Sequence, residues 1–104
     1  MKFEFTGQLK MLVDKAQSGR SNDVDYIMEK LTDSSTFAMT RYVDFALSLI
    51  DKYEGIERIK YYLFNGTLIQ RNYASLYLNR IGDWESVKEA FRQGLIDGIQ
   101  AYSR

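Results

Sequence analysis

Apolar residues recur at intervals of three and four along most of the chain, which is the spacing of one face of an α-helix. Such stripes predict six helices, with apolar positions at Leu9, Leu12, Val13 and Ala16; Val24, Ile27, Met28 and Leu31; Met39, Val43, Ala46, Leu47 and Ile50; Ile56, Ile59 and Leu63; Ala74, Tyr77, Leu78 and Ile81; and Val87, Ala90 and Phe91. The sequence lacks the strict apolar–polar alternation of a strand. The pattern therefore predicts an all-α fold of three helical hairpins.

Residues that favour helix ends separate these stripes. Glycines that suit the left-handed backbone of a helix end divide the chain into helix-length segments: Gly19, Gly55, Gly66, Gly82 and Gly94. Polar residues suited to capping helix N-termini precede the later helices: Ser21 to Asp23, Ser34 to Thr36, Thr67, Asp83 and Asp97. Thr67 with Gln70, and Asp97 with Gln100, have the spacing of a capping box, the second before a short terminal turn. We expect connections of about two to five residues.

The helices also repeat at a nearly constant interval. The second helices share a pattern with steps of 32 and 31 residues: Val24, Ile27 and Leu31, then Ile56, Ile59 and Leu63, then Val87, Ala90 and Gly94. The first helices share another, 31 residues apart: Tyr42, Leu47, Ile50, Tyr53 and Glu54, then Tyr73, Leu78, Ile81, Trp84 and Glu85. A period in this range is typical of stacked two-helix units, which bury their apolar faces against one another. The alternative is chance likeness between amphipathic helices of similar length.

The run from 71 to 83, with Val87 and Ala90 after it, resembles the short HEAT-like repeat of the phycobilisome-lyase type. Residues of the expected type stand at six positions of that pattern: Arg71, Ala74, Leu78, Ile81, Gly82 and Asp83. The resemblance is best over 70–92, fair over 41–64 and weakest before 35. Asp51-Lys52 departs from the usual Gly-Asp, and Trp84 stands where Pro is common. The resemblance implies an α-α superhelix of three stacked hairpins and an adaptor or scaffold role.

Composition narrows the chemistry that the chain can perform. Its 104 residues predict a single domain, 1–104, and include no Cys, His or Pro. Imidazole or thiolate metal ligation and His-dependent nucleophilic catalysis are therefore excluded. The carboxylate pairs Asp23/Asp25 and Glu54/Glu57 leave acid–base catalysis or binding of a hard cation open, although carboxylates at helix starts also stabilise the helix dipole. We predict a protein without enzymatic activity, metal or cofactor.

The sequence predicts a cytoplasmic protein. The first ten residues lack the apolar run of a signal peptide, and no segment has the ~20 apolar residues that span a bilayer. Fourteen basic and fourteen acidic side chains give a net charge of zero, so the whole chain has no field that attracts polyanions.

If the second helices line the concave surface of a stack, their polar residues are displayed to a partner. The residues that we expect to bind this partner lie on the last two of these helices: Glu57, Arg58, Tyr61, Lys88 and Arg92. Tyr and Arg are the residues that most often anchor protein interfaces. We therefore predict a module that binds another protein.

The alternative is binding of nucleic acid or phosphate by the segment 58–82. This segment carries four cations and no carboxylate: Arg58, Lys60, Arg71 and Arg80. Tyrosines are interleaved with them, and stackable rings beside cations are features of single-strand binding. So few phosphate contacts predict weak, salt-sensitive binding. The cations are equally suited to pairing with acidic neighbours, because the segment 21–57 has a net charge of −5.

Apolar residues near both ends are expected to cover the ends of the stack. Phe3 and Phe5 suit the first end, and four residues suit the other: Leu95, Ile96, Ile99 and Tyr102. If apolar surface stays exposed at the ends of the stack, we expect the chain to self-associate through it. Trp84 is expected to pack over a hairpin turn, with an exposed anchor as the alternative.

Overall fold

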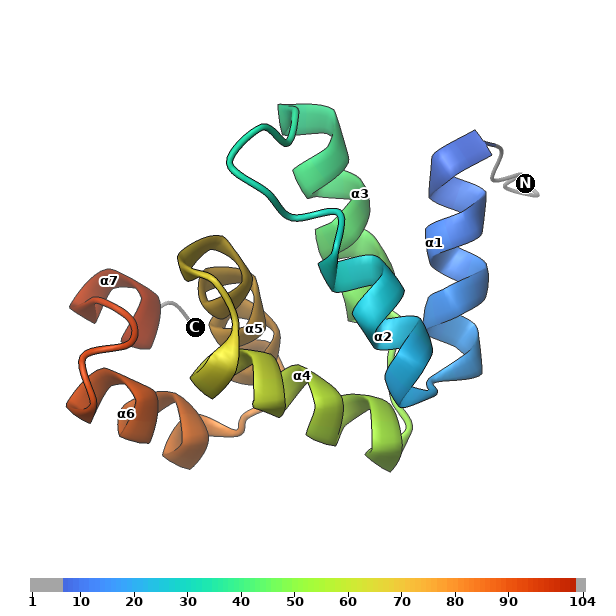
Figure 1. Cartoon of the computed structure of the whole chain (residues 1–104). Helices are drawn as coiled ribbons and strands as arrows, with labels where there is room; N and C mark the ends of the chain where they lie inside the picture. The colour runs from blue at the N-terminus through green and yellow to red at the C-terminus, as the bar shows by residue number, and fades with distance from the viewer. Residues whose placement is uncertain (1–6, 103–104) are drawn as a thin grey trace. The chain divides into compact units, whose positions relative to one another are not determined.

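The structure is a computed structural model that describes residues 7–102, and these residues form seven helices without a strand. In chain order the helices are α1 (Gly7–Ser18), α2 (Ser21–Met28), α3 (Phe37–Ser48), α4 (Tyr53–Asn65), α5 (Leu68–Arg80), α6 (Trp84–Arg92) and α7 (Gly98–Ala101) (Figure 1). The all-α class and the six main helices predicted from the apolar stripes are confirmed. The short terminal turn is α7.

The chain that was predicted as one domain divides into two compact units, Met1–Ile56 and Glu57–Arg104. In the first unit, α1, α2 and α3 contact one another in all three pairs, and the first turn of α4 follows. In the second unit, α5, α6 and α7 contact one another in the same way, and the remainder of α4 precedes them. The regular stack of three hairpins stays a prediction.

The predicted stripes supply the core of each unit. In the first unit the fully buried apolar residues include Leu12 and Ala16 on α1, Val24 and Ile27 on α2, and Val43 and Leu47 on α3. In the second they include Ile59 and Leu63 on α4, Ala74, Tyr77 and Leu78 on α5, and Val87 and Ala90 on α6. Burial at these 3.6-residue intervals is what makes each helix stable in its unit.

Several equivalent positions of the repeat are buried alike, whereas Ile56 is half-buried and Gly94 is exposed although their counterparts are buried. The pairs Val24/Ile27 and Val87/Ala90 are completely buried, as is Leu78, the equivalent of Leu47. Ile50 is buried, but its equivalent Ile81 is 47% exposed. The prediction that Ile81 faces inward is therefore wrong, because α5 ends at Arg80 and Ile81 forms its C-cap.

Four of the predicted N-caps form locally. Each cap side chain accepts a hydrogen bond from the backbone amide three residues later: Thr36 from Met39, Thr67 from Gln70, Asp83 from Ser86 and Asp97 from Gln100. The Thr67 box is complete, since the Thr67 amide donates to Gln70 Oε1 at 2.9 Å. Gln100 instead places its Oε1 3.5 Å from the Ser75 hydroxyl of α5.

The prediction that residues 21–23 cap α2 is wrong, because α2 already begins at Ser21. Its N-cap is Arg20, which makes no side-chain capping bond. The exposed Ser21 amide donates to Glu54 Oε2 at 2.6 Å. A carboxylate distant in sequence thus satisfies an amide that α2 leaves unpaired within the helix.

Gly55 does not end a segment, as the sequence suggested, but lies in the first turn of α4. A Cβ at this position would lie 2.7 Å from Cγ2 of Ile50 and 3.0 Å from the carbonyl oxygen of Gly19. Glycine is needed here because two backbone segments approach each other closely.

The connection between α2 and α3 runs from Glu29 to Thr36 and is longer than predicted. α2 ends at Met28, so Leu31 is buried from the connection rather than from the helix. Ser35 holds the connection together, because its hydroxyl donates to the Lys30 carbonyl at 2.6 Å and accepts from the Thr32 amide at 2.8 Å. Side-chain bonds of this kind compete with continuation of a helix.

The expected coverings of the two ends have different outcomes. Phe3 and Phe5 lie outside the described residues. Ile96 is buried, whereas Ile99 is 77% exposed and Tyr102 is also largely exposed. Trp84 is exposed as well, although its Nε1 donates to the Asn79 carbonyl at 3.3 Å, so it lies over the turn between α5 and α6. Among residues 7–102, no helix combines the length and the apolar character needed to cross a membrane.

Candidate functional site

α4 presents three side chains that form a cation–aromatic cluster, the Arg58 cluster, made of Arg58, Tyr61 and Tyr62. The guanidinium carbon of Arg58 lies 4.1 Å from the centroid of the Tyr61 ring and 5.5 Å from that of Tyr62. The two rings meet edge to face, with centroids 5.5 Å apart and an interplanar angle of 89°. Tyr61 is 45% exposed. Contacts of this kind stabilise by about 0.5–1 kcal/mol at exposed sites and restrict the side chains.

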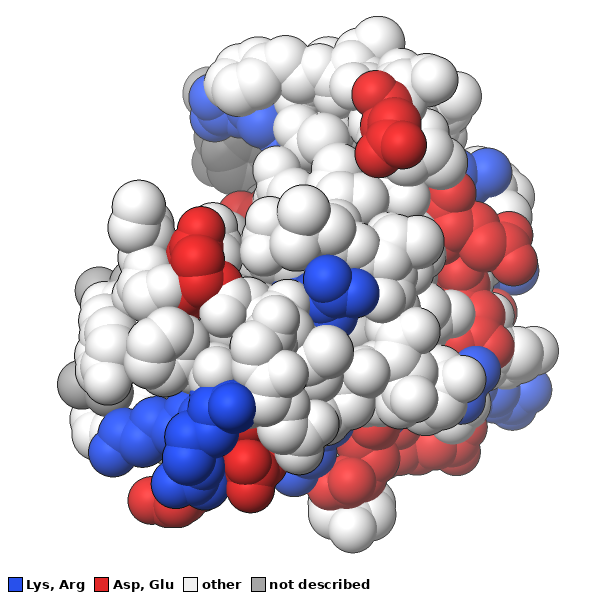
Figure 2. Space-filling model, turned by 60° about the vertical axis from the view of Figure 1, so that its left-hand side comes forward, with Lys and Arg blue, Asp and Glu red and all other residues white. Residues whose placement is uncertain are grey.

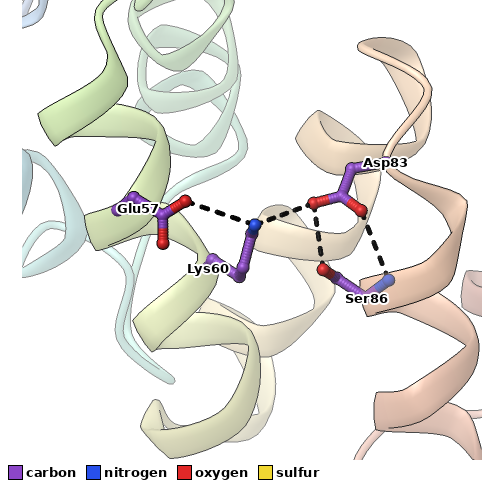
Figure 3. Close-up of polar contacts among 4 residues, drawn as sticks. All are labelled: Glu57, Lys60, Asp83 and Ser86. Carbon is purple, nitrogen blue, oxygen red and sulfur yellow. Dashed lines mark hydrogen bonds and ion pairs between the residues drawn. The ribbon is translucent and has the colours of Figure 1, made fainter.

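Lys60 joins the helix that carries this cluster to the start of α6. Its ammonium lies 3.4 Å from Glu57 Oε1 and 3.2 Å from Asp83 Oδ2 (Figure 3). Asp83 also accepts hydrogen bonds from the amide and the hydroxyl of Ser86, at 3.3 and 2.9 Å. One carboxylate therefore caps α6 and pairs with α4.

The pKa values of Lys60 and Asp83 are both shifted in the direction that favours the charged form. Burial alone would lower the pKa of Lys60, but the carboxylates of Asp83 and Glu57 outweigh burial and raise it. Burial alone would raise the pKa of Asp83, but the Ser86 hydrogen bonds and Lys60 outweigh it and lower the pKa. The link between α4 and α6 is therefore ionic at neutral pH.

α6 carries the other two residues predicted to bind a partner, Lys88 and Arg92. Both are exposed and lie four residues apart, on one side of the helix. The Arg92 guanidinium contacts the Glu89 carboxylate through Nε and Nη2, at 3.3 Å each. The structure thus brings Arg58 and Tyr61 together on α4, with Glu57 one turn before Tyr61, and ties their helix to the one bearing Lys88 and Arg92.

Of the four cations of the alternative nucleic-acid site, Arg58 belongs to the Arg58 cluster, and the other three are less suited to binding phosphate. Arg71 donates from Nε to the Leu95 carbonyl at 2.7 Å and from Nη1 to the Gly66 carbonyl at 2.9 Å, so it joins two connections of the second unit. Lys60 lies between two carboxylates, and Arg80 is exposed at the end of α5. Figure 2 shows basic and acidic residues on the face that it presents, some next to each other and some isolated.

A buried polar group on α5 was not found by sequence reasoning. Ser75 and Asn79 are both buried, and Asn79 Nδ2 donates to the Gln100 carbonyl of α7 at 2.9 Å. Among residues 7–102, Asn79 Oδ1 finds no hydrogen-bond partner. Both residues lie beside the predicted apolar stripe and not in it, so the apolar pattern gave no signal that they are buried. They hold α7 against α5.

The carboxylates considered for catalysis or cation binding have structural contacts. The Ser18 hydroxyl donates to Asp23 and lowers its pKa, against the effect of burial and together with Lys15, which lies 3.4 Å away. The hydrogen bond from the Ser21 amide lowers the pKa of Glu54. Within residues 7–102, no three carboxylates come together as a ligand set for a metal ion.

Comparison with known proteins identifies no relative. No family model matches the chain, and neither a curated protein nor a solved structure is found to be similar to it. We therefore infer the function from the geometry of the chain's own residues.

Proposed function

We propose that the chain is a non-enzymatic protein-interaction module of HEAT-like hairpins that acts in the cytoplasm. Its partner would bind the surface formed by Glu57, Arg58, Tyr61, Lys88 and Arg92. The observation that supports this most is the Arg58 cluster, with the Arg58 guanidinium 4.1 Å from a ring that is 45% exposed. The absence of Cys and His from the sequence supports a role without nucleophilic catalysis.

The cluster suits recognition because its side chains are ordered before a partner arrives. Binding costs less conformational entropy when an aromatic anchor is already held in place. Arg58 and Tyr62 hold Tyr61 from two sides. Tyr and Arg are also the residues whose truncation most often costs more than about 2 kcal/mol at an interface.

The charges of this surface indicate a partner of mixed charge. Glu57 and Arg58 are adjacent in sequence, and Arg92 pairs with Glu89, so the surface carries charges of both signs. Charges of both signs help to select and orient one partner, but they do not attract a polyanion such as nucleic acid in general. For this reason we propose a protein and not a nucleic acid as the partner.

Affinity capture from the native host tests the proposal. We expect the unsubstituted chain to retain a stoichiometric protein partner, and Tyr61→Ala and Arg58→Glu each to reduce retention more than tenfold. Tyr53→Ala is the matched control, because Tyr53 is an even more exposed tyrosine of α4 that lies outside the cluster. Equal retention by all variants, or no partner, contradicts the proposal. So does salt-sensitive binding of a single-stranded oligonucleotide that is lost in Arg80→Glu.

A further inference from the structure

A second candidate site lies in the first unit, separate from the Arg58 cluster of the second. A cavity of about 360 Å³ opens among its three helices. Its walls come from Gly7, Gln8, Met11 and Leu12 of α1, from Tyr26 and Lys30 at and beyond the end of α2, and from Met39 of α3. This volume is at the lower end of the range of ligand sites, about 300–1,000 Å³, and suits a short peptide segment.

Two methionines give this cavity an adaptable apolar wall. Met11 is half exposed although it lies one residue before the buried Leu12, and Met39 faces the same cavity from the first turn of α3. The flexible thioether side chain of methionine adjusts to side chains of different shape. The wall therefore suits a large apolar side chain.

The charge at the cavity is positive and incompletely neutralised. The ammonium groups of Lys30 and Lys15 lie 4.5 and 5.1 Å from the centroid of the Tyr26 ring. Lys15 is paired with Asp23 at 3.4 Å, whereas no ion pair forms between Lys30 and any residue from 7 to 102. Lys30 is half-buried, and an ammonium beside an apolar wall is complementary to a carboxylate next to an apolar group.

We propose that this cavity binds a segment of a partner protein in which a large apolar side chain adjoins an acidic residue. The apolar side chain enters between Met11 and Met39, and the carboxylate pairs with Lys30. This site is independent of the Arg58 cluster, and Tyr61→Ala leaves its binding unchanged. A failure of peptide binding at this cavity can therefore be distinguished from a failure of partner binding at the Arg58 cluster.

Methyl NMR of the full chain labelled at the methionine methyl carbons tests this site with acetyl-Glu-Leu-Phe-amide as the probe. We expect saturable shifts of the Met11 and Met39 signals, while the signal of the fully buried Met28 serves as the internal reference. The uncharged acetyl-Gln-Leu-Phe-amide and the variant Lys30→Gln should each weaken binding about fivefold or more, and Lys30→Arg should retain it. Lys10→Gln is the matched control, because Lys10 is an exposed lysine of α1 paired with Asp14.

Three results would overturn the proposal. The first is the absence of saturable shifts at Met11 and Met39. The second is equal affinity for the acidic and uncharged peptides, or no change in Lys30→Gln. The third is binding that emerges only in the double variant Phe3→Ser/Phe5→Ser, because the occupant would then belong to this chain rather than to a partner.

Discussion

The α1–α2 junction of the first unit and the helix starts of the second unit are fixed in different ways, while α3 of the first unit has a local cap, Thr36. In the first unit, the junction between α1 and α2 is held by residues more than 30 positions away. Lys52 Nζ donates to the Ser18 carbonyl at the end of α1 at 3.2 Å, and Glu54 accepts from the Ser21 amide at the start of α2 at 2.6 Å. The helix dipole favours both contacts, because a positive charge lies at the C-terminus of α1 and a negative charge lies at the N-terminus of α2.

The second unit satisfies its helix starts mainly with neighbouring residues. Thr67, Asp83 and Asp97 each cap the helix that begins immediately after them. The difference shows that a helix end can depend on tertiary contact in one half of a small protein and on local sequence in the other. The α1–α2 junction is complete only when residues 52–55 lie against it.

Substituting a core residue should have the largest effect. Ala74 is completely buried on α5, so Ala74→Asp buries an unpaired carboxylate and should cost several kcal/mol of unfolding free energy. We expect circular dichroism to show loss of cooperative folding. Leu68→Asp is the control, because Leu68 is exposed at the first position of α5, where a negative charge is favourable. A folded Ala74→Asp variant would refute the inward position of this residue.

The close approach in the first unit should give the next largest effect. Gly55→Ala forces a methyl group to 2.7 Å from Ile50 Cγ2, so we expect a loss of about 1–3 kcal/mol in chemical denaturation. Gly98→Ala is the counterpart in the second unit, where the nearest atom to the added Cβ is 3.9 Å away. It should leave stability unchanged or raise it slightly. Equal losses of stability in the two variants would show that the close approach at Gly55 does not constrain the first unit.

A smaller effect separates the two roles of Asp83. Asp83→Ala removes both the local cap of α6 and the ion pair with Lys60, and should cost about 1.5 kcal/mol. Asp83→Asn keeps the capping acceptor but loses the ion pair with Lys60, and should cost about 0.5 kcal/mol. Thermal unfolding of both variants measures the two losses of stability. If Asp83→Asn were as damaging as Asp83→Ala, the ion pair rather than the cap would fix the start of α6.

The smallest effect is a change of pH dependence in the first unit. The Ser21 amide lowers the pKa of Glu54 below its ordinary value of 4.5, so the stabilisation from this carboxylate is present above pH 4.5 and is lost as the pH falls through the folded pKa. Glu54→Gln should therefore lose less stability than the unsubstituted chain between about pH 6 and pH 3. Urea titrations at several pH values check this. Identical pH slopes would show that Glu54 does not hold the junction through its charge.

Much of the fold is predictable from sequence because its signals are local. The apolar stripes and the caps at Thr36, Thr67, Asp83 and Asp97 each involve residues three or four positions apart. The position of Gly55 inside α4 and the role of Glu54 at Ser21 depend on approaches between distant segments. No periodicity contains that information.

The candidate site was predictable to a similar extent. Arg58 and Tyr61 stand three residues apart on a predicted helix, so their contact is a local property. The sequence did not indicate that Lys60 pairs with Asp83, or that Arg71 binds two backbone carbonyls. Both facts depend on how α4, α5 and α6 pack within the second unit, and they weaken the nucleic-acid alternative by occupying two of its four cations.

Photo-crosslinking in the native host tests directly whether a partner protein binds the Arg58 cluster. The photoreactive residue p-benzoylphenylalanine would replace Tyr61 in one sample and Tyr53 in another. Both tyrosines are exposed on α4, and only Tyr61 contacts Arg58 in the structure. We expect a discrete covalent adduct with another protein from position 61 and little from position 53. No adduct at position 61, or equal adducts at both positions, would contradict it.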